Sequence, residues 1–455
     1  MKEIENKALL TDLYELTMAA SYWENKMFAP ATFSLFIRNY PPGRNYFVSA
    51  GLEDVLRYLE NLSFTSEELD YLAGLKLFKE SFLSFLEKFR FSGDVWAIPE
   101  GRIFFANEPV MEITAPIIES QIVETFIINA VNVQVLLATK AARCFYAAQG
   151  RKLVDFSLRR CQGIDAGMKA ARASYMAGFI GTSNVMSGKV YGIPVYGTMA
   201  HSYISSFPNE MEAFQAYARS FPENMVLLVD TYDTIEGCRK AAQVGKQMKG
   251  RGHNLLGIRL DSGDMAQFSR GARQILDREG LKDTQIFASG AFDEHKIQKI
   301  LKEKAEIDSF GVGTKMGVSA DAPYSDMAYK LVKYDGQPVL KLSTGKKILT
   351  SDKQIFRFKD KKGNLVKDVI GLRQEKMDRA ESLLSEVMKE GKITARLPQL
   401  KEIREIFQEE FKLLEERYKS LSSRPPLFPV EISPSLKSLQ KKVIQKVKIK
   451  ELGES

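Results

Sequence analysis

Several short apolar runs in the middle of the chain end in residues that could do chemistry. The runs are LVDFS (153–157), FIGTSN (179–184), VYGTMAH (195–201), MVLLVDTYD (225–233), LLGIRLDSGD (255–264), QIFASG (285–290) and IDSFGVGT (307–314). Each turns from apolar residues to carboxylates, hydroxyls, a histidine or glycines. In parallel α/β proteins the active site lies where the strands end. The pattern therefore predicts a polar site assembled from several strand ends.

Acidic residues and one arginine stand out at these ends. Arg259 and Asp261 are two residues apart on a predicted strand, so their side chains share one face. A cation beside a carboxylate suits a substrate that carries both phosphates and hydroxyls. Asp155 and Asp230 end other runs, and a ring of carboxylates would face Mg²⁺, sugar hydroxyls or a developing cation.

Capping of helices is an alternative explanation for some of these carboxylates. Asp264 can N-cap a helix that begins near Met265, and Asp230 and Asp233 can act in the same way. Side-chain oxygens of aspartate commonly accept a hydrogen bond from the first turn of a helix. These residues therefore have a structural as well as a chemical explanation.

Two further segments indicate anion binding. GVGT at 311–314 follows a predicted strand and would expose backbone N–H groups to a phosphate, although a tight strand-to-helix turn explains the same residues. Its GxGxxxG spacing differs from the GxGxxG of dinucleotide-binding loops. Arg159 and Arg160 follow Phe156, which places a carboxylate clamp beside a stacking face. Surface salt bridges are the alternative for this arginine pair.

Among the chain's three histidines, His201 is the candidate for catalysis. His253 and His295 lie in the charged sequences KGRGHN and DEHK, where we expect solvated side chains. His201 ends the run 195–201, in the same setting as the other polar strand ends. That setting favours a functional role.

The predicted elements alternate between strands and helices across the same region. Segments 266–279 and 294–304 have helical patterning between apolar runs, and such alternation indicates βαβ units with a parallel sheet. The seven runs fit a closed or nearly closed α/β barrel better than an open sheet, which is the alternative.

The rest of the chain is expected to form three further parts. Residues 1–120 read as an α+β domain, joined by strands from about 325–375, while the barrel spans 121–324. Residues 376–424 are predicted to form a charged helical segment. Residues 425–455 then form a basic tail.

Composition narrows the class of protein. With 455 residues, 44% of them apolar and 27% charged, neither a disordered chain nor a small disulfide scaffold is expected. The cysteines Cys144, Cys161 and Cys238 form no CxxC pattern, which is typical of reduced thiols in a cytoplasmic protein. Polar residues interrupt the most apolar segment, 117–142, so we predict a buried core helix there and no membrane association.

The net charge of +8 is concentrated at one end of the chain. Residues 434–450 carry six lysines and no acid, so the remaining residues sum to +2. A basic protein can bind nucleic acid or a membrane surface. No aromatic residue lies among these lysines, however, so nucleic-acid binding is not expected.

Taken together, the motifs resemble those of the nicotinate phosphoribosyltransferase family. The resemblance covers the chain from Thr11 to about Phe358 and depends on motifs that occur in the same order as in the family. They are TDLYELTMAASYW (11–23), DFSLRRCQGIDAG (155–167), GTSNV (181–185), GTMAHSYI (197–204), LLVDTYDT (227–234), GIRLDSGD (257–264), FASGAFDE (287–294) and FGVGTKMG (310–317). The resemblance implies the irregular α/β barrel of the type II phosphoribosyltransferases, with a flanking α+β domain made from both chain ends.

The resemblance also implies a reaction and its partners. Nicotinate and phosphoribosyl pyrophosphate would give nicotinate mononucleotide and pyrophosphate, coupled to ATP hydrolysis and assisted by Mg²⁺, in NAD biosynthesis. Family members pair as homodimers, in which the segment TDLYELT reaches the partner's active site.

Roles for individual residues follow from the same resemblance. Tyr14 of the neighbouring subunit and Phe156 would stack on the pyridine ring, while Arg159 holds the carboxylate of nicotinate and Thr198 lines the pocket. His201 would be phosphorylated by ATP. The phosphoribosyl pyrophosphate contacts would be Asp230, Arg259, Asp261, Ser289, Gly290, Gly313 and Thr314.

Several alternatives stay open. The related nicotinamide enzyme has an aspartate where this chain has Ser183, and an anionic side chain there would repel a carboxylate, so Ser183 favours nicotinate. Quinolinate phosphoribosyltransferase is a second alternative of the same class. On the residues alone, the chain could also be a phosphosugar isomerase or aldolase barrel, for which Lys315 is the strand-end lysine that stands out. A non-enzymatic anion-binding module is the last alternative.

Overall fold

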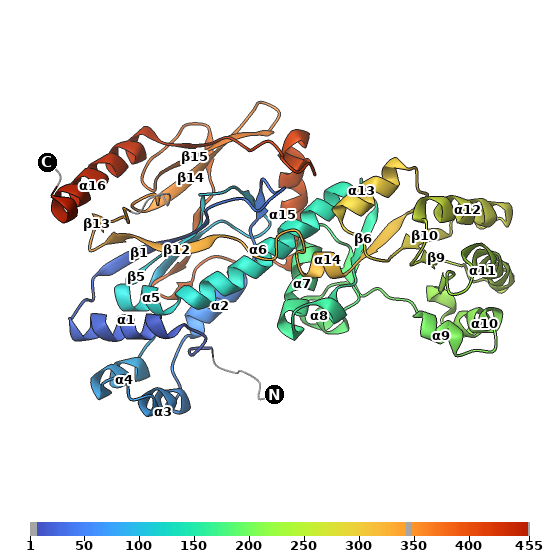
Figure 1. Cartoon of the computed structure of the whole chain (residues 1–455), viewed down its shortest axis with the longest axis horizontal. Helices are drawn as coiled ribbons and strands as arrows, with labels where there is room; N and C mark the ends of the chain where they lie inside the picture. Colours follow the sequence, from blue (N-terminus) through green and yellow to red (C-terminus); the bar gives the residue numbers. More distant parts are fainter. Residues whose placement is uncertain (1–6, 343–347, 454–455) are drawn as a thin grey trace. The chain divides into compact units, whose positions relative to one another are not determined.

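The computed structural model describes residues 7–342 and 348–453 (Figure 1). The chain divides into two compact units. One is formed by Met1–Leu136 with Tyr324–Ser455, and the other by Leu137–Pro323. The second unit starts later than the predicted barrel boundary at residue 121, because helix α6 (Glu124–Ala147) begins in the first unit and ends in the second.

A parallel sheet forms the centre of the second unit. Its strands, among the described residues, are β6 (Lys152–Asp155), β7 (Gly181–Thr182), β8 (Val226–Leu228), β9 (Gly257–Leu260), β10 (Gln285–Ala288) and β11 (Ser309–Val312). Their order is β7-β6-β11-β10-β9-β8, with every pairing parallel. The predicted apolar runs thus become short strands whose core side chains, such as Leu227, Ile258 and Phe310, are fully buried.

The barrel is irregular because one predicted strand is missing. The run 195–201 contributes only an isolated parallel bridge between Val195 and Thr182. Pro194 and Gly197 flank that bridge, and both residue types interrupt strand pairing. Within the described part of the chain, β7 and β8 are therefore the edges of the sheet, and no ladder joins them.

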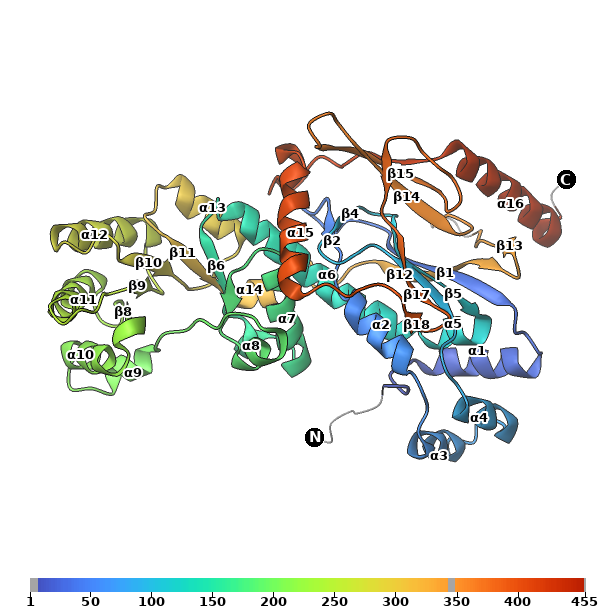
Figure 2. The ribbon, with the colours of Figure 1, turned by 180° about the vertical axis from the view of Figure 1, so that it is seen from behind.

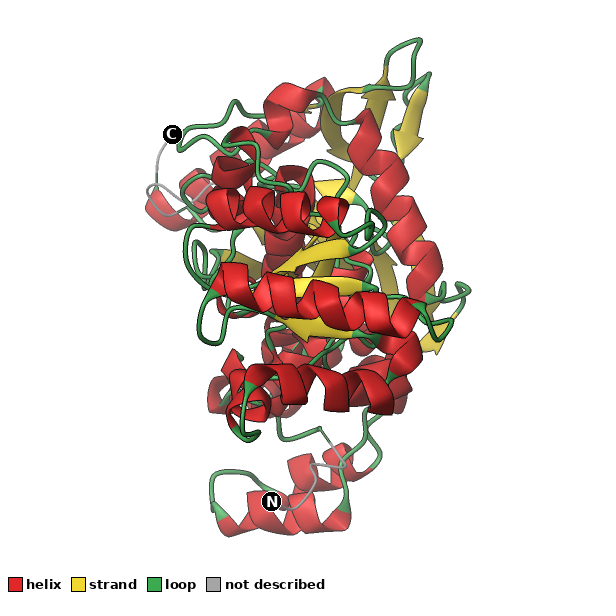
Figure 3. Cartoon of the chain, turned by 90° about the vertical axis from the view of Figure 1, so that its right-hand side faces the viewer, coloured by secondary structure: helices red, strands yellow, loops and turns green. Residues whose placement is uncertain are grey.

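Helices follow the strands and cover the parallel sheet, as the side view shows (Figure 3). They are η1 (Leu158–Arg160), α7 (Ile164–Met176), α8 (Val185–Tyr191), α9 (His201–Ser205), α10 (Glu210–Ser220), η2 (Pro222–Asn224), α11 (Thr234–Lys249), α12 (Met265–Arg278), α13 (Glu294–Lys302) and α14 (Thr314–Gly317). The same device starts α11, α12 and α13. Asp233, Asp264 and Asp293 each accept a hydrogen bond from the backbone N–H three residues later. Asp233 and Asp264 are thus helix N-caps, as the capping alternative predicts.

The first unit contains a mixed α+β fold built from both chain ends. Its helices are α1 (Leu13–Glu24), α2 (Leu52–Asn61), α3 (Ser66–Gly74), α4 (Glu80–Glu87), α5 (Ile117–Ile122), α15 (Leu400–Leu413), η3 (Glu416–Lys419) and α16 (Pro434–Leu452). Its longest sheet has the order β13-β12-β1-β5-β3-β17-β18 among the described residues. The strands are β1 (Pro30–Ile37), β3 (Asp94–Ala97), β5 (Pro109–Pro116), β12 (Met327–Tyr334), β13 (Gln337–Pro338), β17 (Ser385–Lys389) and β18 (Lys392–Ile393).

Two smaller sheets complete the first unit, as the rear view shows (Figure 2). One has the order β16-β14-β15-β19, and the other is the two-stranded antiparallel sheet β2-β4. Their bounds are β2 (Phe47–Val48), β4 (Ile103–Phe104), β14 (Lys353–Lys359), β15 (Leu365–Leu372), β16 (Ala380–Ser382) and β19 (Val430–Ile432). Strand β12 pairs antiparallel with β1, so residues beyond 325 do rejoin the N-terminal module.

The prediction of a helical segment at 376–424 is wrong for its first half. Strands β16, β17 and β18 occupy that half, and the α-helix of the segment is α15 alone. Strand β17 pairs with β3, almost 300 residues earlier in the chain. Such long-range pairing overrides the local helical pattern of a charged segment. The predicted basic tail forms strand β19 and helix α16.

Helix α6 is the element that corresponds to the most apolar segment of the sequence. Among the described residues it is the one helix long and apolar enough to cross a membrane, and 72% of its apolar window is buried inside the protein. It is a helix of the protein core by this measure.

Candidate active site

Arg259, near the end of β9, connects several of the predicted site residues. Its Nε donates to Ser289 Oγ at 2.8 Å, and its Nη2 donates to Asp261 Oδ1 at 2.9 Å. Its Nη1 donates to Thr198 Oγ1 at 3.2 Å and to the Met199 carbonyl at 3.0 Å. Because all three guanidinium nitrogens donate hydrogen bonds, the planar group is held in one orientation.

Asp261 is a preorganised anion beside Arg259. Its carboxylate also accepts a hydrogen bond from the Ser289 hydroxyl. Burial alone would raise the pKa of Asp261, but Ser289, Arg259 and His201 together hold it below its usual value. The carboxylate is therefore ionised at neutral pH, and Oδ2 is directed towards His201, 3.9 Å from its Nε2.

His201 begins α9 and reaches Asp261 from the loop after Val195. Its Nδ1 lies 3.1 Å from Thr231 Oγ1, and its side chain is 44% exposed. Thr231 fixes the orientation of the ring, so Nε2 is the nitrogen that faces the carboxylate. Strand-end residues from three different loops thus meet at this point, as the sequence pattern predicts.

Phe156 supplies an aromatic face next to this polar cluster. The guanidinium of Arg259 lies 5.6 Å from the centre of its ring, and the ring of Phe287 lies 5.5 Å from it. A Cβ at position 311 would come within 2.8 Å of the Phe156 ring, so Gly311 makes room for it. Phe156 and Thr198 therefore both border the Arg259 network, in agreement with a shared pocket.

The two other strand-end carboxylates serve the scaffold. Asp230 Oδ2 accepts hydrogen bonds from the N–H groups of Asp261 and Ser262, at 2.8 and 2.7 Å. Asp155 is fully buried and binds the Ser157 N–H and the Thr182 hydroxyl. Asp230 thus shapes the Asp261 loop, and Asp155 joins the ends of β6 and β7.

The predicted phosphate loops lie at the ends of β10 and β11. Gly290 has a φ of +103°, and a Cβ there would be 1.9 Å from the Asp261 carbonyl. Glycine at this position therefore permits a backbone contact that no other residue allows. Gly313 is half-buried and Thr314 is exposed in the turn that precedes α14.

Arg159 and Ser183 are less closely connected to the cluster. Arg159 lies exposed on η1 and makes no ion pair with another described residue. Ser183 is half-buried, and its N–H donates to the Asp155 carbonyl at 2.8 Å. Both follow the ends of adjacent strands, β6 and β7.

Tyr14 belongs to the other compact unit. It lies on α1 with 46% of its surface exposed, and burial together with the nearby Glu124 and Glu15 raises its pKa. Its phenol is therefore neutral at physiological pH and can offer an uncharged aromatic face.

No group of three or more metal-ligating side chains occurs among residues 7–342 and 348–453. Two carboxylate oxygens are nevertheless available at adjacent strand ends. Asp230 Oδ1 is buried and has no hydrogen-bond partner among the described residues, and Asp261 Oδ2 lies 3.9 Å from His201 Nε2. Mg²⁺ is commonly bound by one or two carboxylates together with substrate phosphates, and these oxygens fit that mode.

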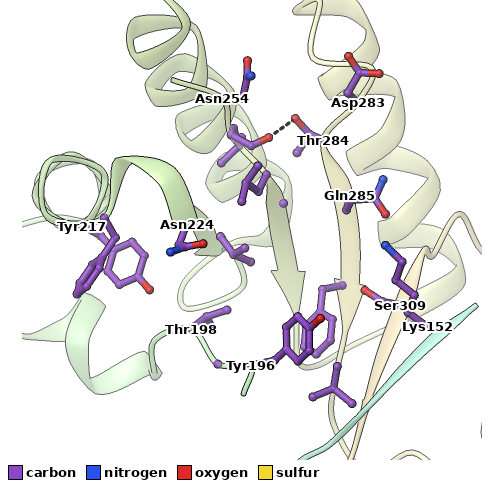
Figure 4. Close-up of a pocket in the computed structure, with 18 of the residues that line it drawn as sticks. Lys152, Tyr196, Thr198, Tyr217, Asn224, Asn254, Asp283, Thr284, Gln285 and Ser309 are labelled. Carbon is purple, nitrogen blue, oxygen red and sulfur yellow. Dashed lines mark hydrogen bonds between the residues drawn. The ribbon is translucent and has the colours of Figure 1, made fainter. Parts of the chain in front are cut away.

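A cavity of about 910 Å³ is lined by residues at the N-terminal ends of the parallel strands, among them Lys152, Gln285 and Ser309 (Figure 4). Figure 4 shows Tyr217 and Asn224 on one side of it and Gln285 and Ser309 on the other. Its lining includes Phe156 and Thr198 but none of the other predicted site residues. The cavity thus adjoins the predicted pyridine pocket, while Arg259 and Asp261 lie at the opposite, C-terminal ends of the strands.

Some functional residues were not singled out by the sequence. Thr231 and Met199 contact His201 and Arg259 through a side chain and a carbonyl; both lie within the motifs LLVDTYDT and GTMAHSYI, but neither was given a role of its own. Gly311 was noticed as part of a phosphate loop, although its contact is with Phe156. A signal existed for Thr231, because it directly follows Asp230 at a strand end.

Three family models match the chain in order. They describe the nicotinate phosphoribosyltransferase N-terminal domain at residues 9–132, the family core at 151–370 and the C-terminal domain at 376–440. Together they cover most of both compact units.

Named relatives agree with the family models. A nicotinate phosphoribosyltransferase of Mycobacterium tuberculosis is 45% identical over 94% of this chain and 91% of its own length. The Bacillus subtilis protein of that name is 36% identical over 98% and 96%. The crystal structure of human nicotinic acid phosphoribosyltransferase superposes with a TM-score of 0.85 at 27% identity, covering 96% of this chain and 100% of that one. The chain belongs to the nicotinate phosphoribosyltransferase family.

Proposed function

We propose that this protein is a nicotinate phosphoribosyltransferase. It joins nicotinate to phosphoribosyl pyrophosphate and releases nicotinate mononucleotide and pyrophosphate, with ATP as a co-substrate. Membership of the family supports the reaction class. The arrangement of polar groups at the C-terminal ends of the strands supports the location of the active site there.

The observation that carries the proposal is the network around Arg259. It links Thr198, which lines the same cavity as Phe156, to Asp261 and Ser289. One guanidinium therefore connects an aromatic pocket to an anionic site. A transfer between a pyridine ring and a phosphorylated sugar requires both to be adjacent.

The residues at this site can carry the chemistry of the transfer. Loss of pyrophosphate leaves positive charge on the sugar, and the ionised Asp261 would stabilise that charge. Arg259 would neutralise the leaving group. The pyridine nitrogen attacks without a general base, so the positioning by Phe156 and Thr198 accounts for much of the rate.

Mg²⁺ is expected to bind with the diphosphate. Asp261 Oδ2 and Asp230 Oδ1 are the carboxylate oxygens that would hold it. When bound, the ion supplies charge neutralisation at the leaving group. Holding this ion would also give the buried Asp230 Oδ1 the partner that it lacks.

ATP coupling is assigned to His201. Thr231 binds Nδ1 of the ring, which leaves the half-exposed Nε2 to accept a phosphoryl group. A phosphate there would add about two negative charges beside Asp261. That repulsion would alter the loop after Val195 and so link ATP hydrolysis to the transfer.

The proposed reaction is tested by one comparative assay. Purified protein is incubated with phosphoribosyl pyrophosphate and Mg²⁺, and with nicotinate, nicotinamide or quinolinate, in the presence and absence of ATP. We expect mononucleotide from nicotinate alone, at a higher rate with ATP. Product from nicotinamide or quinolinate alone would contradict the substrate assignment based on Ser183.

The role of His201 is tested by His201→Ala. Since the arginine network does not use His201, we expect this variant to keep a slow, ATP-independent synthesis and to lose ATP hydrolysis coupled to it. The measurement is ADP release per mononucleotide formed, and His253→Ala serves as the control because His253 pairs with Glu223 outside the polar cluster. Coupled hydrolysis in His201→Ala would disprove the phosphohistidine assignment.

We further propose a homodimer in the cytoplasm. On and just before α1, Leu10, Leu13 and Tyr14 are 42%, 51% and 46% exposed, and a group of exposed apolar side chains is typical of an interaction site. The described cysteines are all unpaired, which fits a reducing compartment. Light scattering on the purified protein tests the dimer, and a monomer at micromolar concentration would contradict it.

A further inference from the structure

Two lysines lie beside the predicted phosphate loops and contact the same aspartate, one through its ammonium group and the other through its backbone N–H. Lys315 follows the GVGT turn, and its Nζ lies 2.6 Å from Asp293 Oδ2. Lys296, on α13, donates from Nζ to the Gly290 carbonyl at 2.6 Å. Asp293 Oδ1 also accepts the backbone N–H of Lys296, at 2.8 Å. One aspartate therefore organises both lysines.

The charged residues around α13 form two layers, a buried inner layer and a more exposed outer layer. Positive and negative charges balance in the inner layer but not in the outer layer. In the inner layer, the buried Glu294 pairs with Lys140 at 2.5 Å and with Arg143 at 2.9 Å, and Lys140 also pairs with Asp321. These two cations and two anions cancel. The outer layer has two ammonium groups, Lys296 and Lys315, beside Asp293. The charge of Asp261 also acts on Lys296, but Asp261 is already paired with Arg259, so positive charge remains in excess.

The unbalanced layer carries an electrostatic cost. Burial and the charge of Lys315 lower the pKa of Lys296, so the two ammonium groups are close enough to repel each other. The side chain of Lys315 is 48% exposed and accessible to a ligand. A site lined by charges of one sign raises the local concentration of ions of the opposite sign.

We propose that Lys296 and Lys315 bind the terminal phosphate monoester of the sugar substrate, and that Asp293 is the residue that positions Lys315. This inference deepens the proposed function and rests on it for the identity of the ligand. A phosphate monoester carries about two negative charges at neutral pH, which suits two ammonium groups of which only Lys315 is paired with Asp293. The diphosphate end is assigned to Arg259, on the neighbouring strand β9.

The inner layer explains how the pair is held in place. Glu294 fixes the first turn of α13 through two buried ion pairs, and Lys296 lies in that same turn. The ammonium of Lys296 also lies 4.6 Å from the centre of the Phe292 ring. The lysines are thus preorganised, which reduces the entropy lost when the anion binds.

Two fragments of the sugar substrate allow binding of its monoester end and of its diphosphate end to be measured separately. Ribose 5-phosphate carries only the monoester, and inorganic pyrophosphate carries only the diphosphate. Their dissociation constants are measured by calorimetry for the full chain and for Lys296→Met and Lys315→Met. We expect each variant to bind ribose 5-phosphate at least tenfold more weakly and pyrophosphate within about twofold of the parent.

Lys299→Met is the matched control. Lys299 lies on the same helix, but its side chain is 75% exposed and its nearest carboxylate, Glu303, is 3.9 Å away. We expect its affinity for both probes to match the parent. Equal ribose 5-phosphate affinity in Lys296→Met, Lys315→Met and Lys299→Met would overturn the proposal, as would weakened binding of pyrophosphate alone.

Asp293→Asn tests the positioning role. Asparagine also caps helices well, so α13 keeps its start while the ion pair to Lys315 is lost. We expect the dissociation constant for ribose 5-phosphate to rise at least threefold. An unchanged affinity for pyrophosphate would show that the fold is intact. Unchanged or tighter binding would show that Asp293 does not position Lys315. A protein that binds both probes as described but makes no mononucleotide would instead refute the proposed function.

Discussion

Asp261 shows how one side chain can be prepared for several tasks. Arg259 and Ser289 bind one of its oxygens, whereas the other faces His201. The first set of contacts keeps the carboxylate ionised and oriented, and the second leaves an oxygen available to substrate or metal. A conservative change that removes the charge should therefore affect the reaction far more than the fold.

For Asp261→Asn we expect turnover to fall by roughly 10²–10³-fold, the usual effect of one lost electrostatic contact in an active site. The melting temperature should change by only a few degrees, because asparagine can still accept hydrogen bonds from Arg259 and Ser289. Steady-state kinetics and thermal unfolding measure the two effects.

Asp264→Asn is the control for that variant. Asp264 caps α12, and asparagine is an equally good cap, so near-normal turnover is expected. Comparable turnover in the two variants would remove Asp261 from the mechanism.

Glu15, on α1, predicts a pH dependence of stability. Its pKa is raised to about 7, chiefly by burial, so the folded chain binds this proton more tightly than the unfolded chain does. The resulting stabilisation is complete below about pH 4.5 and is lost as the pH rises through 7. We expect the free energy of unfolding to fall between pH 5 and pH 8 by roughly 1–2 kcal/mol more in the parent than in Glu15→Gln. Urea denaturation at both pH values measures it, and identical pH slopes would contradict the assignment.

The loop between β10 and α13 positions two parts of the site at once. Gly290 brings the loop against the Asp261 carbonyl, and Asp293 caps the helix that follows. Because Gly290 packs against that carbonyl and Asp293 begins α13, a shift of either residue would move its neighbours as well. Changes in this loop should therefore be transmitted to Asp261 on the neighbouring strand.

Gly290→Ala tests this connection. The new methyl would meet the Asp261 carbonyl at 1.9 Å, so the loop must move, and we expect at least a tenfold loss of kcat/KM for the sugar substrate. Gly252→Ala is the control, because Gly252 also has a positive φ, +86°, but open space around its Cβ position. If Gly290→Ala reduced kcat/KM as little as Gly252→Ala does, the contact between Gly290 and the Asp261 carbonyl would not be needed for activity.

The elements also show which features a sequence can predict. Arg259 and Asp261 were predicted to share a face because strand periodicity is local, and they do form an ion pair. The start of α12 at Asp264 follows from capping chemistry, which is local as well. Strand β17 was missed because its partner, β3, is remote in the chain. The ion pair between Asp293 and Lys315 was missed for the same reason, since it joins two separate loops.

In the molecule as a whole, the first unit depends on a buried charge cluster. Arg357, fully buried on β14, binds Asp368 with Nη2–Oδ2 at 2.6 Å and also pairs with Glu410. Glu108 lies beside them, and burial and the charge of Asp368 raise its pKa well above the usual range. Arg357 therefore compensates buried carboxylates contributed by distant segments, and Arg102 also pairs with Glu410.

Arg357→Met should destabilise the protein by about 3–5 kcal/mol, the usual result of leaving buried charges without a partner. Lys359→Met on the same strand should cost about 1 kcal/mol or less, because the pair between Lys359 and Glu381 is partly exposed. Chemical denaturation of the two variants measures the difference. Equal stability would mean that the cluster does not hold the unit together.

Helix α16 has a consequence for how the protein behaves on charged supports. Helix α16 carries six lysines and one acidic residue, Glu451, so it contributes five of the eight net positive charges. Nearly all of its lysines are exposed. The protein should therefore adsorb to a cation-exchange resin in one preferred orientation, through α16. Its elution position then reports the integrity of the C-terminus. A preparation clipped before residue 434 would separate from the intact chain on such a column, whatever its catalytic activity.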